Sequence, residues 1–206
     1  MNTNRSAAFL LSLFCLPLFS QEKAVTGSGK ILLIYPDGTW KEAKTNIPAT
    51  GTDGITRSKT STAKAGILKG RAAIYYNPKK WNPKGIEEGG RTGFIHAEGD
   101  AQAIVLTERI QMPMENLEKV ALDNAKAAAP DAVVTHRETK HVNGLDVVAL
   151  QMQGTIQGTR FCYYNYYYSC EKGVIQVITF TSQNLFNEFK ADFDDFLNGL
   201  TLEPSN

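Results

Sequence analysis

The chain has 206 residues, of which 42% are hydrophobic and 21% are charged, close to the averages of soluble globular domains. It carries 22 Lys and Arg residues against 21 Asp and Glu residues, so its formal net charge at pH 7 is +1. A nucleic-acid partner normally requires a basic surface, and this near balance argues against one. We therefore expect a soluble protein with a packed core that does not bind nucleic acid.

Residues 1–20 have the composition of a secretory signal peptide. Arg5 precedes an apolar run from Ala7 to Phe19, and the small residue Ser20 ends it. The run is shorter than the roughly 20 residues that a membrane-spanning helix needs, and no later segment reaches that length. We therefore predict a cleaved signal peptide and a periplasmic or secreted product that does not span a membrane.

The three cysteines have different expected fates. Cys15 lies in the signal segment behind the bulky Phe14, which argues against a lipoprotein. An exported protein can form a disulfide between Cys162 and Cys170. On one extended strand, however, these residues would lie about 26 Å apart, whereas a disulfide needs Cα atoms within about 7 Å. The strand-like sequence between them favours two free thiols, and a bridge would require a turn.

Residues 21–43 are predicted to contain a small β-hairpin. Ile31 to Tyr35 is apolar and β-branched enough for a strand, and Pro36-Asp37-Gly38 suits a turn. Trp40 then falls on the returning strand. Two strands alone are barely stable in water, so the hairpin must dock on another surface or remain mobile.

Residues 44–67 are rich in Thr, Gly, Ser, Lys and Ala, which predicts a flexible linker before a domain over residues 68–202. In that domain, Asn77 to Pro83 is predicted as a loop because it contains two prolines. Strands are expected at 72–76, 92–98, 101–110, 132–142, 145–153, 160–169 and 174–181.

Two helices complete the predicted domain. The first runs from Met114 to Ala128, and the second runs from about Gln183 to Asn198. Asn143-Gly144 between two strand-like runs is a strong hairpin signal. Apolar side chains line one side of the second helix: Leu185, Phe186, Phe189, Phe193, Phe196 and Leu197. The order of strands, helix, strands and helix predicts an α+β fold, an antiparallel sheet with helices packed on it.

Several of these features together resemble the PsbP-like fold, a group that includes the photosystem II extrinsic protein, its bacterial relatives and a Ran-binding nuclear import factor. The resemblance covers roughly residues 68–202. The features are Ala73-Ile74-Tyr75-Tyr76 followed by Pro78 and Trp81, Ile104-Val105-Leu106 leading to Met114-Glu115-Asn116-Leu117, Val142-Asn143-Gly144, the tyrosine-rich strand of residues 160–169 (the tyrosine strand), and the closing Phe-rich helix. The resemblance implies an α/β/α sandwich and a binding or accessory role without catalysis. It provides no catalytic motif.

No motif for catalysis, cofactors or metals stands out. Gly27-Ser28-Gly29-Lys30 resembles the end of a P-loop, but Ile31 replaces the Ser or Thr that would contact magnesium. His136 and His141 are five residues apart on a predicted strand, so they point to opposite faces. We expect surface or partly buried histidines and a buried, inert Cys162, with no catalytic residue, cofactor or metal.

Four aromatic residues are the candidate ligand-binding residues. Tyr164, Tyr166 and Tyr168 alternate on one face of the tyrosine strand, and tyrosine is common at binding surfaces. The alternative is that these rings pack under helices and only their hydroxyl groups reach the rim. Trp81, in the predicted proline-flanked loop, is the fourth candidate because loops often carry function.

These observations favour an exported, non-catalytic binding or accessory protein of the cell envelope. Its partner would be a protein or another envelope component that the sequence does not identify. The alternative is a carrier of a small apolar or lipid ligand held between the sheet and a helix.

Overall fold

The computed structural model describes residues 22–25, 31–34, 39–42, 54–87 and 90–203. The chain divides into two compact units, residues 1–52 and residues 53–206. The predicted signal peptide, the turn at Pro36-Asp37-Gly38 and the P-loop-like segment lie outside the described residues.

The first unit contains a three-stranded antiparallel sheet in the order β1-β2-β3. Its strands are β1 (Glu22–Val25), β2 (Ile31–Ile34) and β3 (Trp40–Glu42). The pairing of β2 with β3 confirms the predicted hairpin, with Ile34 opposite Trp40. Strand β1 pairs with the other edge of β2 and was not predicted.

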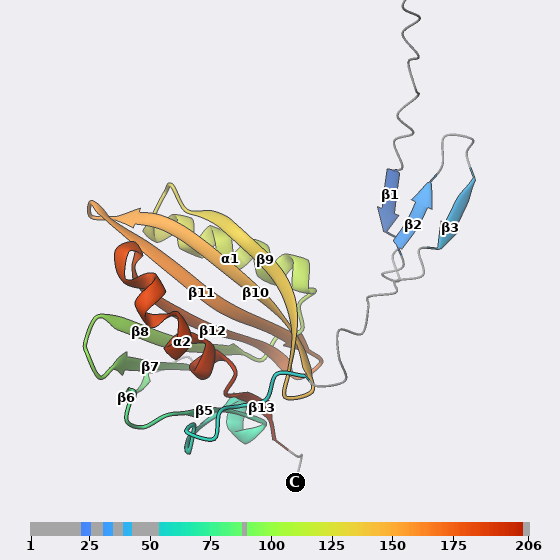
Figure 1. Cartoon of the computed structure of the whole chain (residues 1–206). Helices are drawn as coiled ribbons and strands as arrows, with labels where there is room; N and C mark the ends of the chain where they lie inside the picture. Colours follow the sequence, from blue (N-terminus) through green and yellow to red (C-terminus); the bar gives the residue numbers. More distant parts are fainter. Residues whose placement is uncertain (1–21, 26–30, 35–38, 43–53, 88–89, 204–206) are drawn as a thin grey trace, which may run out of the picture. The chain divides into compact units, whose positions relative to one another are not determined.

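The second unit holds a seven-stranded antiparallel sheet, a three-stranded sheet and two main helices (Figure 1). The large sheet has the order β6-β7-β8-β12-β11-β10-β9, and the small sheet has the order β13-β5-β4. In chain order the elements are β4 (Ala63–Ile67), the short 3-10 turn η1 (Leu68–Gly70), β5 (Ala72–Tyr76), β6 (Trp81–Glu87), β7 (Arg91–His96), β8 (Ala101–Glu108), α1 (Met114–Ala128), β9 (Val133–Val142), β10 (Leu145–Ile156), β11 (Thr159–Cys170), β12 (Gly173–Ser182), the 3-10 turn η2 (Gln183–Leu185), α2 (Phe186–Leu197) and β13 (Leu200–Leu202).

The two helices cover opposite faces of the large sheet, which confirms the predicted α+β fold. Side chains that follow one another along a strand point to opposite faces. On β11, Tyr166 belongs to the core cluster beneath α2, whereas Tyr167 belongs to the cluster beneath α1. Strand β10 alternates in the same way. The predicted antiparallel sheet with helices packed on it is therefore an α/β/α sandwich.

The larger core lies between α2 and the sheet. Phe189, Phe193, Phe196 and Leu197 of α2 are at most 2% exposed, as the spacing of apolar residues in the final helix predicts. Burying a phenylalanine contributes about 2 kcal/mol, so this helix is a principal source of stability. The remaining apolar residues of the predicted set, Leu185 and Phe186, pack against the same core.

Two predictions about the start of this unit are wrong. Ala63–Ile67, which the sequence placed in the linker of residues 44–67, form β4 and pair with β5. The predicted loop from Asn77 to Pro83 ends at Trp81, where β6 begins. Proline is tolerated in β6 because this strand lies at the edge of the sheet and is irregular between Pro83 and Gly85.

Asn143 ties the predicted hairpin to the end of the domain. Its φ of 48° and the φ of 82° at Gly144 are the left-handed values that a tight Asn-Gly turn requires. Its side-chain amide donates hydrogen bonds to the carbonyl oxygens of Asn198, at 2.7 Å, and Leu200, at 2.8 Å. Its side-chain oxygen accepts one from the backbone N–H of Arg57 at 2.9 Å. One residue therefore joins three segments that are distant in the sequence.

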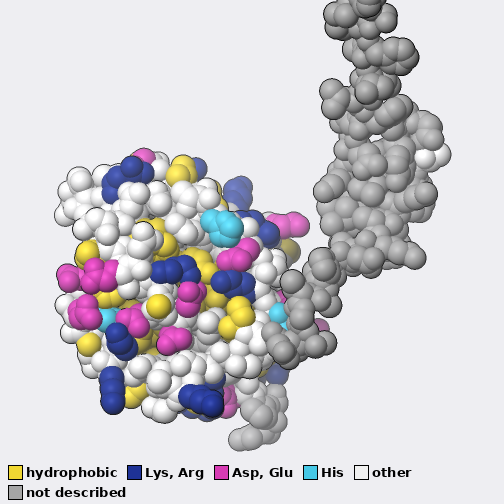
Figure 2. Space-filling view, viewed as in Figure 1, with side chains coloured by type: hydrophobic (Ala, Val, Ile, Leu, Met, Phe, Trp, Pro, Cys, Tyr) yellow, Lys and Arg dark blue, Asp and Glu magenta, His cyan; other side chains and the backbone are white. Residues whose placement is uncertain are grey.

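Acidic and basic side chains are mixed on the face that carries α2, with no large area of one charge (Figure 2). None of the helices within the described ranges is long and apolar enough to span a membrane.

A substitution at Gly199 tests how tightly the end of α2 is packed. A Cβ atom at this position would clash with the carbonyl oxygen of Tyr75. Because backbone atoms cannot move aside cheaply, we expect Gly199→Ala to lower the free energy of unfolding by about 2 kcal/mol or more. At Gly66 a Cβ atom would meet nothing within 4 Å, so Gly66→Ala should change stability by less than about 0.5 kcal/mol. Urea denaturation of both variants measures the difference, and equal stabilities would contradict the close contact.

Candidate functional site

Trp81 is part of the core and does not present its ring to a partner. It is 1% exposed, and its ring centre lies 4.8 Å from that of Phe196 and 5.1 Å from that of His96. Trp81 was a binding candidate because of its predicted position in a loop, and that position is wrong. Trp81 begins the edge strand β6 and faces inward, under α2. Its indole is needed for packing.

The tyrosines predicted to share a face do so, and they pack as the alternative interpretation expected. Tyr164 and Tyr166 are at most 2% exposed, and Tyr168 is half-buried against the same core. The hydroxyl of Tyr164 accepts a hydrogen bond from Lys140 at 2.7 Å, and that of Tyr166 donates one to Asn198 at 3.0 Å. The rings of Tyr164 and Tyr166 are therefore closed to a ligand.

The histidines do not converge on a common site. His96 is 1% exposed, more buried than the sequence indicated, and its Nδ1 accepts a hydrogen bond from the backbone N–H of Glu98. Nε2 therefore carries the proton and donates to the Asp192 carboxylate at 3.1 Å. His136 and His141 contact different carboxylates, at 3.7 and 2.8 Å. Among the described residues, no group of His, Cys, Asp and Glu side chains is arranged to hold a metal ion.

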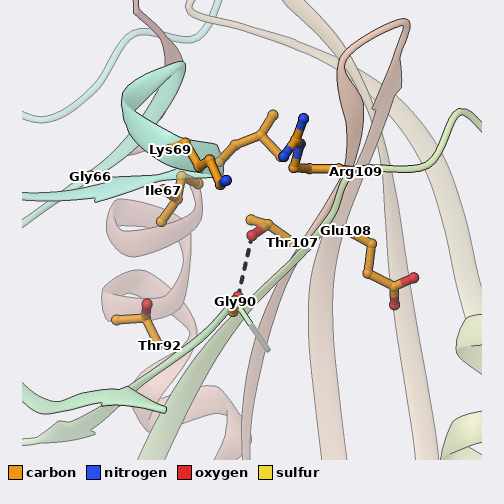
Figure 3. Close-up of a pocket in the computed structure, with 9 residues that line it drawn as sticks. Gly66, Ile67, Lys69, Gly90, Thr92, Thr107, Glu108 and Arg109 are labelled. Carbon is orange, nitrogen blue, oxygen red and sulfur yellow. Dashed lines mark hydrogen bonds between the residues drawn. The ribbon is translucent and has the colours of Figure 1, made fainter. Parts of the chain in front are cut away.

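A pocket of about 450 Å³ opens where the small sheet meets the large one (Figure 3). The end of β4 and the turn η1 form one side of it, and the adjoining ends of β7 and β8 form the other. The apolar floor comes from Ile67 and Leu68, each 6% exposed. The remaining lining residues are Gly66, Lys69, Gly90, Thr92, Thr107, Glu108 and Arg109.

Two cations dominate the electrostatics of this pocket. Lys69 and Arg109 lie at one side of it, near Thr107 and Gly90, whereas the Glu108 carboxylate points away (Figure 3). Neither cation has an ion-pair partner within the described part of the chain. The hydroxyl of Thr107 donates a hydrogen bond to the carbonyl oxygen of Gly90 at 3.3 Å and joins the β7 and β8 sides of the lining. The arrangement suits a negatively charged group joined to an apolar one.

The turn that carries Lys69 has an unusual backbone. Leu68 and Lys69 have φ values of 50° and 55°, in the left-handed region that disfavours residues with a Cβ atom. Leu68 is held there by its buried side chain and by the hydrogen bond from the Arg71 N–H to its carbonyl oxygen. Lys69 is exposed, so packing does not hold its side chain in place.

Sequence reasoning missed this pocket entirely. Its lining comes from three segments that are separated along the chain and carry no motif. The one usable signal was Lys69-Gly70 directly before the predicted strand of residues 72–76, because glycine is common in tight turns.

Comparison with known proteins identifies the fold. No protein-family model matches the chain, and no curated protein has a significant sequence match. The solution structure of cyanobacterial PsbP from Synechocystis has a TM-score of 0.53 with this structure at 13% identity, covering 76% of this chain and 99% of that one. The chain has the PsbP-like fold. At such low identity the similarity establishes the fold alone, and it confirms the resemblance seen in the sequence.

Two further PsbP-like matches have TM-scores of 0.49. One is the Ran-binding protein Mog1p of Saccharomyces cerevisiae, 5% identical, with coverage of 68% of this chain and 94% of that one. The other is a protein of unknown function from Pseudomonas aeruginosa, 16% identical, with coverage of 60% and 90%.

The backbone at Lys69 leads to a test of whether this lysine costs stability. Lys69→Gly removes the unfavourable left-handed conformation of a residue with a Cβ atom, so we expect no loss of stability and a gain of up to about 1 kcal/mol. Lys119→Gly, within α1, should instead cost about 1 kcal/mol because helical backbone does not favour glycine. Urea denaturation of both variants measures the effects. A clear destabilisation by Lys69→Gly would show that the lysine supports the fold.

The two thiols of the PsbP-like domain should differ in reactivity. Burial raises the pKa of the Cys162 thiol to about 11, and the residue is fully buried. At pH 8 only about 0.1% of it is thiolate, the reactive form. Cys170 is half-buried, and neither thiol forms a disulfide. An alkylating reagent should therefore label Cys170 in the folded protein and both residues in urea, as mass spectrometry of peptides can show. Rapid native labelling of Cys162 would contradict its burial.

Proposed function

We propose that the chain is an exported, non-catalytic binding or accessory protein of the cell envelope, and that its pocket beside Lys69 and Arg109 holds a negatively charged group of its partner. The predicted signal peptide supports export. The pocket supports binding, because two cations stand at the edge of an apolar floor without a counter-charge from the described residues.

The lining of the pocket fits binding better than catalysis. Among its nine residues there is no histidine or cysteine, and its one carboxylate points away from the two cations. Nucleophilic or acid–base catalysis requires a nucleophile or base aimed at a common point. The side chains that do face the pocket supply positive charge and hydroxyl groups, which are binding groups.

The alternative role, a carrier of an apolar ligand between sheet and helix, receives less support. The space between α2 and the sheet is occupied by the rings of Trp81, Phe94, Phe193 and Phe196, each at most 1% exposed. An apolar ligand would have to displace this core at a cost of several kcal/mol.

A comparison of three forms of the exported protein tests the proposal. The first is the wild type, the second is Lys69→Ala with Arg109→Ala, and the third is the matched control Lys119→Ala with Arg160→Ala, at exposed positions outside the pocket. Each form is used to capture material from an envelope extract, and native mass spectrometry records bound small molecules.

We expect the wild type and the control to capture the same partner and the pocket variant to capture at least about ten-fold less, since each charge-assisted hydrogen bond contributes about 1.5–3 kcal/mol. Equal capture by all three forms would refute the role of the pocket. A lipid retained equally by all three would favour the carrier.

A further inference from the structure

One wall of the pocket is a free sheet edge. β4 is the terminal strand of the small sheet and pairs only with β5. On the other side of β5, the N–H of Tyr75 donates to the carbonyl oxygen of Gly199 at 2.9 Å. Tyr75 therefore directs its backbone groups toward β13, and so does Ala73, because alternate residues of a strand bond to the same side.

This alternation determines which groups of β4 are free. Lys64 stands opposite Tyr75, and Gly66 stands opposite Ala73. In an antiparallel pair, residues opposite each other either bond to each other or both face away. Lys64 and Gly66 thus turn their N–H and C=O groups outward, to an edge that no described strand covers.

Gly66 joins this edge to the pocket. It lines the pocket, it is exposed, and a Cβ atom placed on it would meet nothing within 4 Å. An incoming backbone could therefore approach closely, as strand addition requires. Lys69 follows the C-terminal end of β4, and Arg109 lies on the same side of the pocket (Figure 3). A chain that runs parallel to β4 therefore reaches them with its own C-terminal end.

We infer that this site binds the C-terminal residues of an extended peptide, which pairs in parallel with β4 through Lys64 and Gly66 and places its terminal carboxylate beside Lys69 and Arg109. The last side chain of the peptide contacts the apolar floor formed by Ile67 and Leu68. This inference rests on the proposed function of the pocket and names the chemical class of the partner: the free C-terminus of a protein.

The probe is a library of short peptides with randomised C-terminal residues and free carboxylates, selected against the purified exported chain. The tightest binder is then synthesised as the free acid, as the C-terminal amide, and in forms N-methylated at one backbone amide at a time. Binding is measured by fluorescence anisotropy at constant ionic strength, because screening by salt weakens exposed charge pairs.

We expect the amide to bind at least about ten-fold more weakly than the free acid, since it loses the charge that the two cations recognise. N-methylation should weaken binding at every second amide only, because alternate N–H groups of a strand face its partner. Gly66→Leu should abolish binding by filling the pocket while the circular dichroism spectrum stays that of the wild type. The control Lys119→Ala with Arg160→Ala should bind the free acid as the wild type does.

Equal binding of acid and amide, or equal binding of all N-methylated forms, would overturn the inference. It would also be overturned if no free-acid peptide bound while vesicles of anionic phospholipid did. In these cases the proposed function would still stand if envelope capture remained dependent on Lys69 and Arg109. If capture were independent of both residues, the proposed function itself would fail.

Discussion

The packing of α2 against the large sheet determines where the other features of the domain lie. Phe193 and Phe196 are fully buried against Trp81 and Phe94, so the helix is fixed to the edge strand β6 and to its neighbour β7. The same helix contacts β5 of the small sheet. Directly after it, Gly199 passes so close to the backbone of Tyr75 that no other residue fits. One helix therefore holds the two sheets together, and the pocket exists because their ends meet.

Features governed by local physics could be predicted from the sequence. The first helix has the predicted bounds, Met114–Ala128, because the flanking prolines Pro113 and Pro130 and the apolar spacing are local signals. The turn at Asn143-Gly144 and the alternation of the tyrosine strand are local in the same sense. Not every apolar residue of α1 is covered, since Val120 is 36% exposed and only Leu117 and Ala121 are buried. How much of a helix is covered depends on the sheet beneath it, which spacing alone does not reveal.

Features that depend on distant partners could not be predicted. The polar, glycine-containing composition of β4 gave no sign of a strand. The segment forms a strand because it pairs with β5, which in turn pairs with β13. Trp81 looked like a loop residue because of its prolines, but its burial is decided by phenylalanines more than a hundred residues later in the chain. The candidate site could not be predicted for the same reason, because Lys69 and Arg109 come together only when the two sheets meet.

The conformation of Lys69 is the strongest physical reason to treat the pocket as a site. A non-glycine residue in the left-handed region costs roughly 1–2 kcal/mol, and such cost is tolerated where surrounding structure enforces it or function needs it. For Leu68 the reason is packing, since its side chain is in the core. For Lys69 packing gives no reason for the left-handed conformation, because the side chain is exposed. A glycine at this position would relieve the backbone but would carry no ammonium group. That group lies with Arg109 on the same side of the pocket, and the Glu108 carboxylate points away from both (Figure 3). The backbone cost and the cationic pair thus both support the proposed binding of an anion.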